Sequence, residues 1–223
     1  MRLKPSWASW LAPLALLPCL ACSSMGGSGS FLIFGGPEMP QQALVDSVRS
    51  AAVETEESQE DYGSALNLFQ RLTAPQAVEI ETLNEDFDEA LEECQQRADD
   101  LAERLESVRT EADTLFQSWT QDLEHFSGDA LRKKSEAMMV ETQARAQRVI
   151  TSLESVRASM TPVLLKLQDY SLFFRHNLNA RAIATLEDTY KGFDSEFTAL
   201  NQELEQARAE MATFLAGFEA PVE

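Results

Sequence analysis

Residues 83–123 read "LNEDFDEALEECQQRADDLAERLESVRTEADTLFQSWTQDL", and an apolar side chain recurs there at every third or fourth position. Charged and amide side chains fill most of the positions between. The spacing holds over roughly five heptads, which is typical of a long helix that packs through a coiled-coil-type seam. The seam consists of Leu83, Phe87, Leu91, Cys94, Ala98, Leu101, Leu105, Val108, Ala112, Leu115, Trp119 and Leu123.

Three other segments repeat this spacing before and after the long seam. One runs from Leu44 to Phe69, another from Leu131 to Phe174, and the last from Ile183 to Phe218. Each is apolar on one side only, so none is stable alone and the four must bury their seams together. Residues expected in the shared core include Trp119, Leu131, Met138 and Phe193.

Turn signals separate the seams and set the lengths of the helices. Thr73–Pro75, Ser127–Gly128 and His176–Asn179 suit turns or helix caps, which leaves two long central helices over 76–125 and 129–176. Short connections make neighbouring helices antiparallel. The sequence therefore predicts an all-α fold, an elongated antiparallel four-helix bundle with coiled-coil-type packing.

The predicted bundle domain covers residues 41–218 and leaves one local choice open. Pro162 lies inside the third seam. It either kinks one continuous helix, since the apolar phase is the same on both sides, or opens a new helix after Thr161. Because four seams in one chain can satisfy one another, we expect a monomer.

Acidic residues dominate the charge of the chain. It has 37 Asp and Glu against 18 Lys and Arg, a formal net charge of −19 at pH 7. Nucleic acid and anionic lipid head groups are poor partners for such a surface. With 44% hydrophobic residues the chain is expected to fold rather than remain disordered.

The first 21 residues have the organisation of a signal peptide. Arg2 and Lys4 precede an apolar stretch over 7–20, which is too short to span a membrane. Cys22 follows a small residue, and this arrangement resembles the bacterial lipobox, in which the cysteine is acylated and becomes the first residue of the mature chain. The alternative is a plain cleaved signal followed by a free cysteine.

Lipidation at Cys22 would anchor the protein to a membrane through its N-terminus. Residues 22–40 are rich in Gly, Ser and Pro and are predicted to be a lipidated flexible linker. Its apolar tetrad, Phe31–Phe34, either enters the lipid interface or docks on the protein's own core. By resemblance to lipoprotein sorting rules, Ser23 favours the outer membrane, so we expect the protein at its periplasmic face.

The cysteines predict no intrachain disulfide. Cys19 leaves with the signal peptide and Cys22 is acylated, so Cys94 stands alone. Because Cys94 lies on the long seam, it is predicted to be a small buried hydrophobe rather than a nucleophile.

Three stretches carry a family resemblance. They are "LVDSVRSA" (44–51), "LFQSWTQDLEHFSGDALRKKSE" (115–136) and "MTPVLLKLQDYSLFFRHNLNARAIATLE" (160–187). They resemble the bacterial envelope proteins grouped as domain of unknown function 2959. The resemblance implies a Gram-negative lipoprotein with a long helical domain, and it brings no activity, cofactor or substrate.

Motifs for catalysis or metal binding are not found in the sequence. There is no phosphate-binding Gly-rich loop, no nucleophile elbow and no zinc-protease motif. Residues 84–95 begin with the spacing of a calcium loop but lack its Gly and its bidentate Glu, so they are predicted to be an acidic helix face. His125 and His176 fall at opposite ends of the predicted bundle. We expect no catalytic residue, no cofactor, no metal and no small-molecule substrate.

The turn after the third seam is the candidate for contact with a partner. Arg175, His176, Asn177 and Arg181 gather there beside two aromatic residues, and Arg and aromatic side chains are enriched at protein interfaces. The alternative is that both arginines pair with acidic residues beside the turn. We expect a membrane-tethered structural or scaffolding element of the bacterial envelope. The alternative function is a protein-binding module or regulator that presents residues 173–181 to an envelope protein, and an enzyme of unrecognised type is less favoured.

Overall fold

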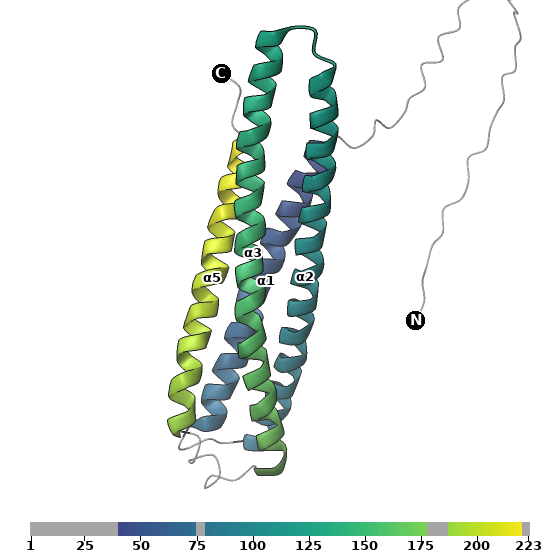
Figure 1. The fold of residues 1–223 in the computed structure, drawn as a ribbon. Coiled ribbons are helices and arrows are strands. Elements are labelled where there is room, and N and C mark those ends of the chain that lie inside the picture. The colour runs from purple at the N-terminus through teal and green to yellow at the C-terminus, as the bar shows by residue number, and fades with distance from the viewer. Residues whose placement is uncertain (1–39, 75–78, 178–186, 220–223) are drawn as a thin grey trace, which may run out of the picture. The chain divides into compact units, whose positions relative to one another are not determined.

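Four long helices make up the part of the chain that the computed structural model describes, residues 40–74, 79–177 and 187–219 (Figure 1). No strand occurs within these ranges. The predicted all-α class and the four-helix bundle are confirmed. The helices are α1 (Pro40–Thr73), α2 (Ile80–Glu124), α3 (Asp129–Asn177) and α5 (Glu187–Glu219).

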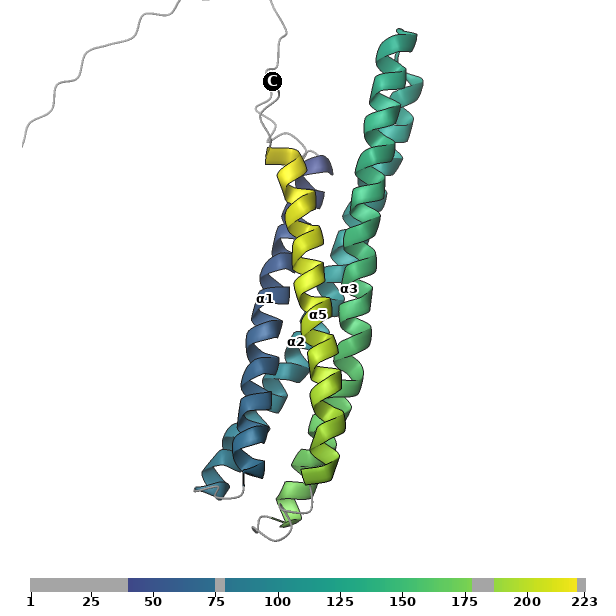
Figure 2. The same cartoon turned by 90° about the vertical axis from the view of Figure 1, so that its left-hand side faces the viewer.

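The four helices form a ring in which each packs chiefly on two neighbours. α1 packs on α2, α2 on α3, α3 on α5, and α5 on α1. Neighbouring helices run antiparallel (Figures 1 and 2), which follows from the shortness of connections such as the one at 125–128. α2 and α3, with 45 and 49 residues, are each about 70 Å long at 1.5 Å per residue.

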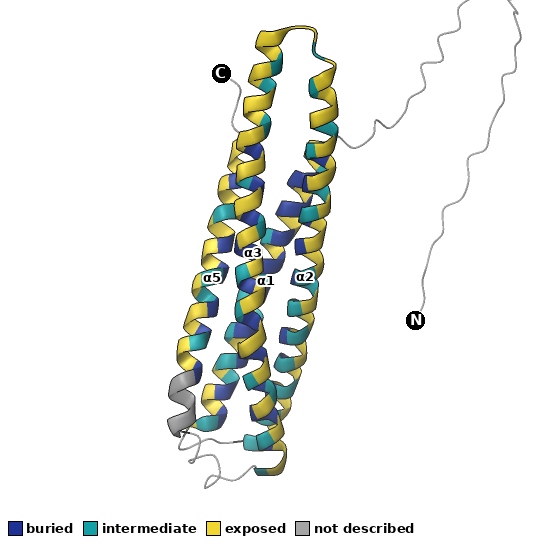
Figure 3. Ribbon diagram, viewed as in Figure 1, coloured by how far each residue is buried: buried dark blue, intermediate teal, exposed yellow. Residues whose placement is uncertain are grey.

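The inward faces of the helices follow the predicted seams closely (Figure 3). Burying each large apolar side chain contributes about 1.5 to 3 kcal/mol, which makes this shared core the main source of stability. Ile183, where the last seam was predicted to start, lies outside the described residues. Predicted seam residues that are buried include Leu44, Phe69, Leu83, Phe87, Cys94, Leu101, Leu105, Val108, Ala112, Leu115, Phe174 and Phe193.

Aromatic rings from all four helices meet at the end of the bundle where α3 ends. The ring centroid of Phe69 lies 4.4 Å from that of Tyr170 and 5.3 Å from that of Phe193. It lies 6.2 Å from those of Phe87 and Phe174. The rings are tilted or edge-on to Phe69, which are favourable arrangements for aromatic pairs. This aromatic layer ties the four helices together at that end.

At the other end, α2 and α3 extend beyond α1 and α5 (Figure 2). α1 begins at Pro40, which lines a small hollow together with Trp119. α5 ends just after Phe218, whose ring lies 5.9 Å from the guanidinium carbon of Arg145. Residues 116–141, which we call the tip hairpin, include no buried residue.

The tip hairpin contradicts two of the predicted core positions. Leu131 is 61% exposed and Met138 is 53% exposed, so both predictions are wrong. Trp119 is only partly buried, and its indole Nε1 donates to Ser135 Oγ at 2.8 Å. The cause is that α1 and α5, with 34 and 33 residues, are shorter than α2 and α3. The apolar seam continues where no helix remains to cover it.

Pro162 lies inside α3, which is one continuous helix. The alternative of a new helix after Thr161 is therefore wrong. Pro162 has no amide to donate to the carbonyl of Ala158, but both residues are exposed. Water can supply the missing hydrogen bond, which is why the helix tolerates a proline at this position.

Ion pairs join every pair of neighbouring helices. The pair of Arg97 and Asp61 is partly buried. The pairs at the other three helix contacts are largely exposed and contribute about 0 to 1 kcal/mol each, so they act mainly on the register of the helices. The pairs are Arg97–Asp61 between α2 and α1, Arg109–Glu154 between α2 and α3, Lys166–Glu196 between α3 and α5, and Arg208–Glu56 between α5 and α1.

Candidate functional site

The predicted contact residues lie at the C-terminal end of α3. Arg175 and His176 are exposed. Asn177 is half-buried, and its Nδ2 donates to the carbonyl of Phe173 at 3.0 Å. Phe174 is fully buried in the aromatic layer. The structure therefore places Arg175 and His176 at the surface, directly beside a residue that is fixed in the core.

Two of the predicted site residues lie outside the described residues. They are Cys22, the predicted lipidation site, and Arg181, the fourth residue of the predicted contact. Their roles stay predictions. No described ion pair involves Arg175.

The two histidines lie at opposite ends of the bundle. The backbone amide of His125, at the end of α2, donates to the carbonyl of Asp122 at 3.0 Å, whereas His176 lies in the last turn of α3. Residues 84–95 form part of α2, as predicted. Among the residues that the structure describes, no group of three or more His, Cys, Asp or Glu could hold a metal ion.

Cys94 is buried, as predicted from its place on the seam. Burial raises the pKa of its thiol to about 12, and the negative charges of Asp61 and Glu93 add to that effect. Burial also raises the pKa of the nearby Tyr62 phenol, with a smaller contribution from Cys94. Because the thiolate is the reactive form of cysteine, Cys94 is inert at neutral pH.

The densest charged contact joins α2 to α1. Arg97 Nε donates to Asp61 at 2.7 Å, and its Nη1 donates to Glu57 at 2.7 Å and to Glu54 at 3.2 Å. The Glu54 side chain is only 7% exposed. Burial raises the pKa of Glu54 more than the hydrogen bond from Arg97 lowers it. Since one guanidinium on α2 serves three carboxylates on α1, the cluster fixes the register of these two helices.

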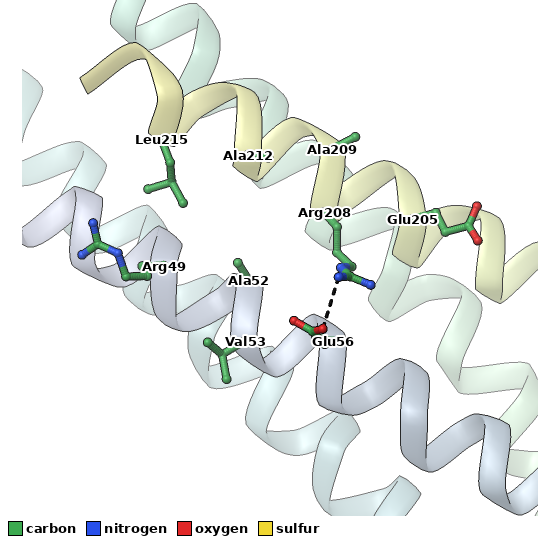
Figure 4. A pocket seen from close by; sticks show the side chains of 9 residues that line it. All are labelled: Arg49, Ala52, Val53, Glu56, Glu205, Arg208, Ala209, Ala212 and Leu215. Carbon is green, nitrogen blue, oxygen red and sulfur yellow. Dashed lines mark ion pairs between the residues drawn. The ribbon is translucent and has the colours of Figure 1, made fainter. Parts of the chain in front are cut away.

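A groove of about 510 Å³ lies between α1 and α5 (Figure 4). Small side chains on the facing helices, Ala52 and Ala212, leave this space open. The cations at its edge are already paired, because Arg208 lies 3.3 Å from Glu56 and Arg49 is paired with the acidic residue one turn before it. The groove therefore offers an apolar floor without a free cation.

A second groove lies between α2 and α3 and consists of two adjoining hollows of about 350 and 330 Å³. Ala98 and Ala102 of α2 face Leu165 across the hollow nearer the end of α3. Arg157 lines both hollows and is exposed. No described carboxylate lies within ion-pair distance of its guanidinium. This groove differs from the first in having a free cation at its centre.

Sequence reasoning missed Arg157 and the exposed face of α3, because it followed only the inward seam of each helix. The sequence did contain a second regular series on α3 that could have indicated this face. Its members are uncharged, lie seven residues apart and are all exposed. They are Ala137, Ala144, Thr151, Ala158, Leu165 and Leu172.

Within the described ranges, no helix contains an apolar stretch that is long enough to cross a membrane. No curated protein and no solved structure matches this chain. The model of the family described as protein of unknown function (DUF2959) matches residues 38–218. That match spans nearly the whole described bundle, including the α2–α3 groove and the end of α3, and the chain belongs to the DUF2959 family.

Proposed function

We propose that this chain is a lipid-anchored structural element of the bacterial envelope that acts by contact and not by catalysis. The observation that carries the proposal is that the buried ionisable groups take part in the packing of the helices. Glu54 is engaged with Arg97, and Cys94 is a deeply buried neutral thiol. These buried ionisable groups are thus part of the framework that holds the helices together.

The N-terminal sequence supports the anchor and the location. Cys22 follows an apolar signal-like stretch, and Ser23 is the neighbour that favours the outer membrane. The anchor would hold the bundle at the periplasmic face of the outer membrane. The linker over 22–40 would give the bundle reach from the membrane surface.

Fatty-acid labelling tests the anchor. Cells that express the full chain are fed a clickable fatty acid, and the purified protein is examined for label. The label should be lost in Cys22→Ala and kept in Cys19→Ala, which is the matched control three residues away. Label that survives in Cys22→Ala would contradict the anchor, and fractionation of the mature protein with inner-membrane markers would contradict the location.

A protein-binding role for the end of α3 is the second candidate. It is favoured by Arg175, which is exposed and unpaired among the described residues, beside the buried Phe174. Photo-crosslinking in cells from positions 175, 177 and 181 should capture an envelope protein, whereas position 60 on the exposed face of α1 should not. Capture from position 60 with none from the other three would reject this candidate.

A further inference from the structure

The outward face of α3 is unusually apolar for an acidic protein. Of the six large hydrophobic residues that are exposed in the described ranges, only Val53 lies outside α3. Leu131 and Met138 belong to the uncovered seam of the tip hairpin. Leu165 and Leu172 are 57% and 54% exposed and lie on the opposite, outward side of α3.

Leu165 and Leu172 belong to a second heptad series, the outer stripe, which we define as residues 137, 144, 151, 158, 165 and 172. A helix with apolar residues on two sides is normally covered on both. A series with a period of seven stays on one side of a helix over a long distance and suits packing against another long helix. The bundle covers only the inward seam of α3, so the outer stripe lacks a partner helix within the described chain.

Charge indicates which helix would suit this face. α3 contains eight Lys and Arg against five Asp and Glu, a net charge of +3, whereas α2 contains three against fifteen, a net charge of −12. Several cations of α3 have no ion-pair partner among the described residues, including Lys133, Lys134 and Arg157. The strongly acidic long helix that would complement α3 is the type that this chain itself carries as α2.

The groove between α2 and α3 provides the shape for close contact. Ala98 and Ala102 on α2 and Ala158 and Thr161 on α3 leave the two adjoining hollows between the helices. Small residues at such positions allow another helix to approach closely. Arg157 sits where the two hollows meet and could reach a carboxylate on the helix that enters.

We propose that the α2–α3 face packs against the same face of a second copy of this chain. A two-fold axis parallel to the helices places α3 of each copy over α2 of the other, in antiparallel orientation. The basic helix then meets the acidic helix twice. This arrangement also brings Arg157 of one copy to the level of Asp99 and Glu103 of the second copy, both of which are exposed.

The area is sufficient for a stable dimer only if both helices take part. The outer stripe spans residues 137–172, which is about 50 Å at 1.5 Å per residue, and a helix is roughly 10 Å wide. One helix face therefore offers about 500 Å² per copy, less than the roughly 800 Å² per partner of a standard interface. Adding α2 brings the face into that range, which supports a two-helix contact.

The sequence-based expectation of a monomer took account only of the inward seams. The α1–α5 groove is also open, but its cations are already paired with acidic residues. It also lacks the opposite charges on neighbouring helices that α2 and α3 present. The self-association face is independent of the lipid anchor and does not rest on the proposed function.

Photo-crosslinking of the full chain in cells tests the proposal directly. The crosslinking residue is placed at position 165 and, as a matched control, at position 53, since Leu165 and Val53 are exposed to 57% and 53%. Position 165 should give a product of two identical chains, identified by mass spectrometry, and position 53 should give none. A product at 165 that contains only a different protein, or no product at all, would overturn the proposal.

Co-isolation of two differently tagged full-length copies gives the second readout. Leu165→Glu and Arg157→Glu, each made in both copies, should lower the recovery of the second copy about tenfold or more. Val53→Glu should leave recovery unchanged. Because all three changes are at exposed positions, circular dichroism should show the same helix content in each. Equal recovery in Leu165→Glu and wild type, or a loss confined to Val53→Glu, would refute the proposal that the α2–α3 face joins two copies.

Discussion

Replacing Arg97 by methionine should destabilise the bundle by about 2 to 3 kcal/mol at neutral pH. The substitution keeps much of the apolar stem and removes the guanidinium that three carboxylates of α1 share. Breaking a fully buried ion pair costs about 3 to 5 kcal/mol, and breaking an exposed pair costs about 0 to 1. The cluster lies between these limits, because Glu54 is 7% exposed but Glu57 is 45% exposed.

The pH dependence of this loss follows from Glu54. Burial raises its folded pKa above the ordinary value of 4.5, so keeping it ionised destabilises the folded state. That penalty is absent below pH 4.5, grows as the pH rises from 4.5 to the folded pKa, and is complete above the folded pKa. Removing Arg97, which lowers this pKa, makes the penalty larger. The destabilisation should therefore be greatest at pH 7 and should shrink toward about pH 4.

Urea unfolding followed by far-UV circular dichroism at both pH values measures the effect. In thermal unfolding, the melting temperature should fall by about 5 to 10 °C for a domain of this size. Adding Glu54→Gln to Arg97→Met should recover part of the loss. Arg104→Met is the matched control, because Arg104 is an exposed arginine of α2 with no ion pair to a described residue. An equal loss at both pH values, or the same loss in the control, would refute the electrostatic explanation.

Three further measurements test the core, its limits and the buried thiol. Phe69→Ala should cost about 4 kcal/mol because the ring is fully buried among four others, and Trp119→Ala should cost about half as much because its side chain is only partly buried. Urea midpoints of the two variants compare these costs, and equal costs would contradict the conclusion that the core ends before the tip hairpin. Leu131→Ser should change stability by less than about 0.5 kcal/mol, whereas Leu153→Ala should cost about 2 to 5 kcal/mol, and a large loss in Leu131→Ser would show that the tip seam is covered. The folded pKa of Cys94 is raised to about 12 from 9.0, so the contribution of the neutral thiol to stability is present below pH 9.0 and is lost as the pH rises from 9.0 to about 12. In Cys94→Ala, the free energy of unfolding should therefore fall less steeply with pH over this interval. The same dependence on pH in the variant and the wild type would count against a buried neutral thiol.

The inward face of each described helix could be predicted from spacing alone. Phe69, Phe87, Phe174 and Phe193 fall on the predicted seams, and all four are buried. Periodicity is a local property, since the positions that share a side of a helix depend only on 3.6 residues per turn. The burial of Cys94 followed in the same way. The contact hypothesis at the end of α3 also came from local composition, and the exposure of Arg175 is consistent with it.

The exposure of the outer stripe and the position of Arg157 in the α2–α3 groove required the structure. Leu165 and Leu172 had the spacing of a second seam, but a sequence alone does not tell how many sides of a helix its neighbours cover. The ring order of the helices decided that α3 is covered by α2 and α5 and is open on its outer side. It also decided that Arg97 has three carboxylates within reach, while Arg157 has none among the described residues.

The sequence by itself determined the described helices, the turn between α2 and α3 and the side of each helix that is apolar, because these depend on residues within one or two turns of each other. Only the tertiary structure decided where the core stops. Leu131 and Met138 continue the seam of α3 without interruption, yet both are exposed, because α1 begins and α5 ends before the tip hairpin. Burial requires a neighbour at the same height, and the height at which each helix begins and ends relative to the others is set by packing between segments far apart in the chain.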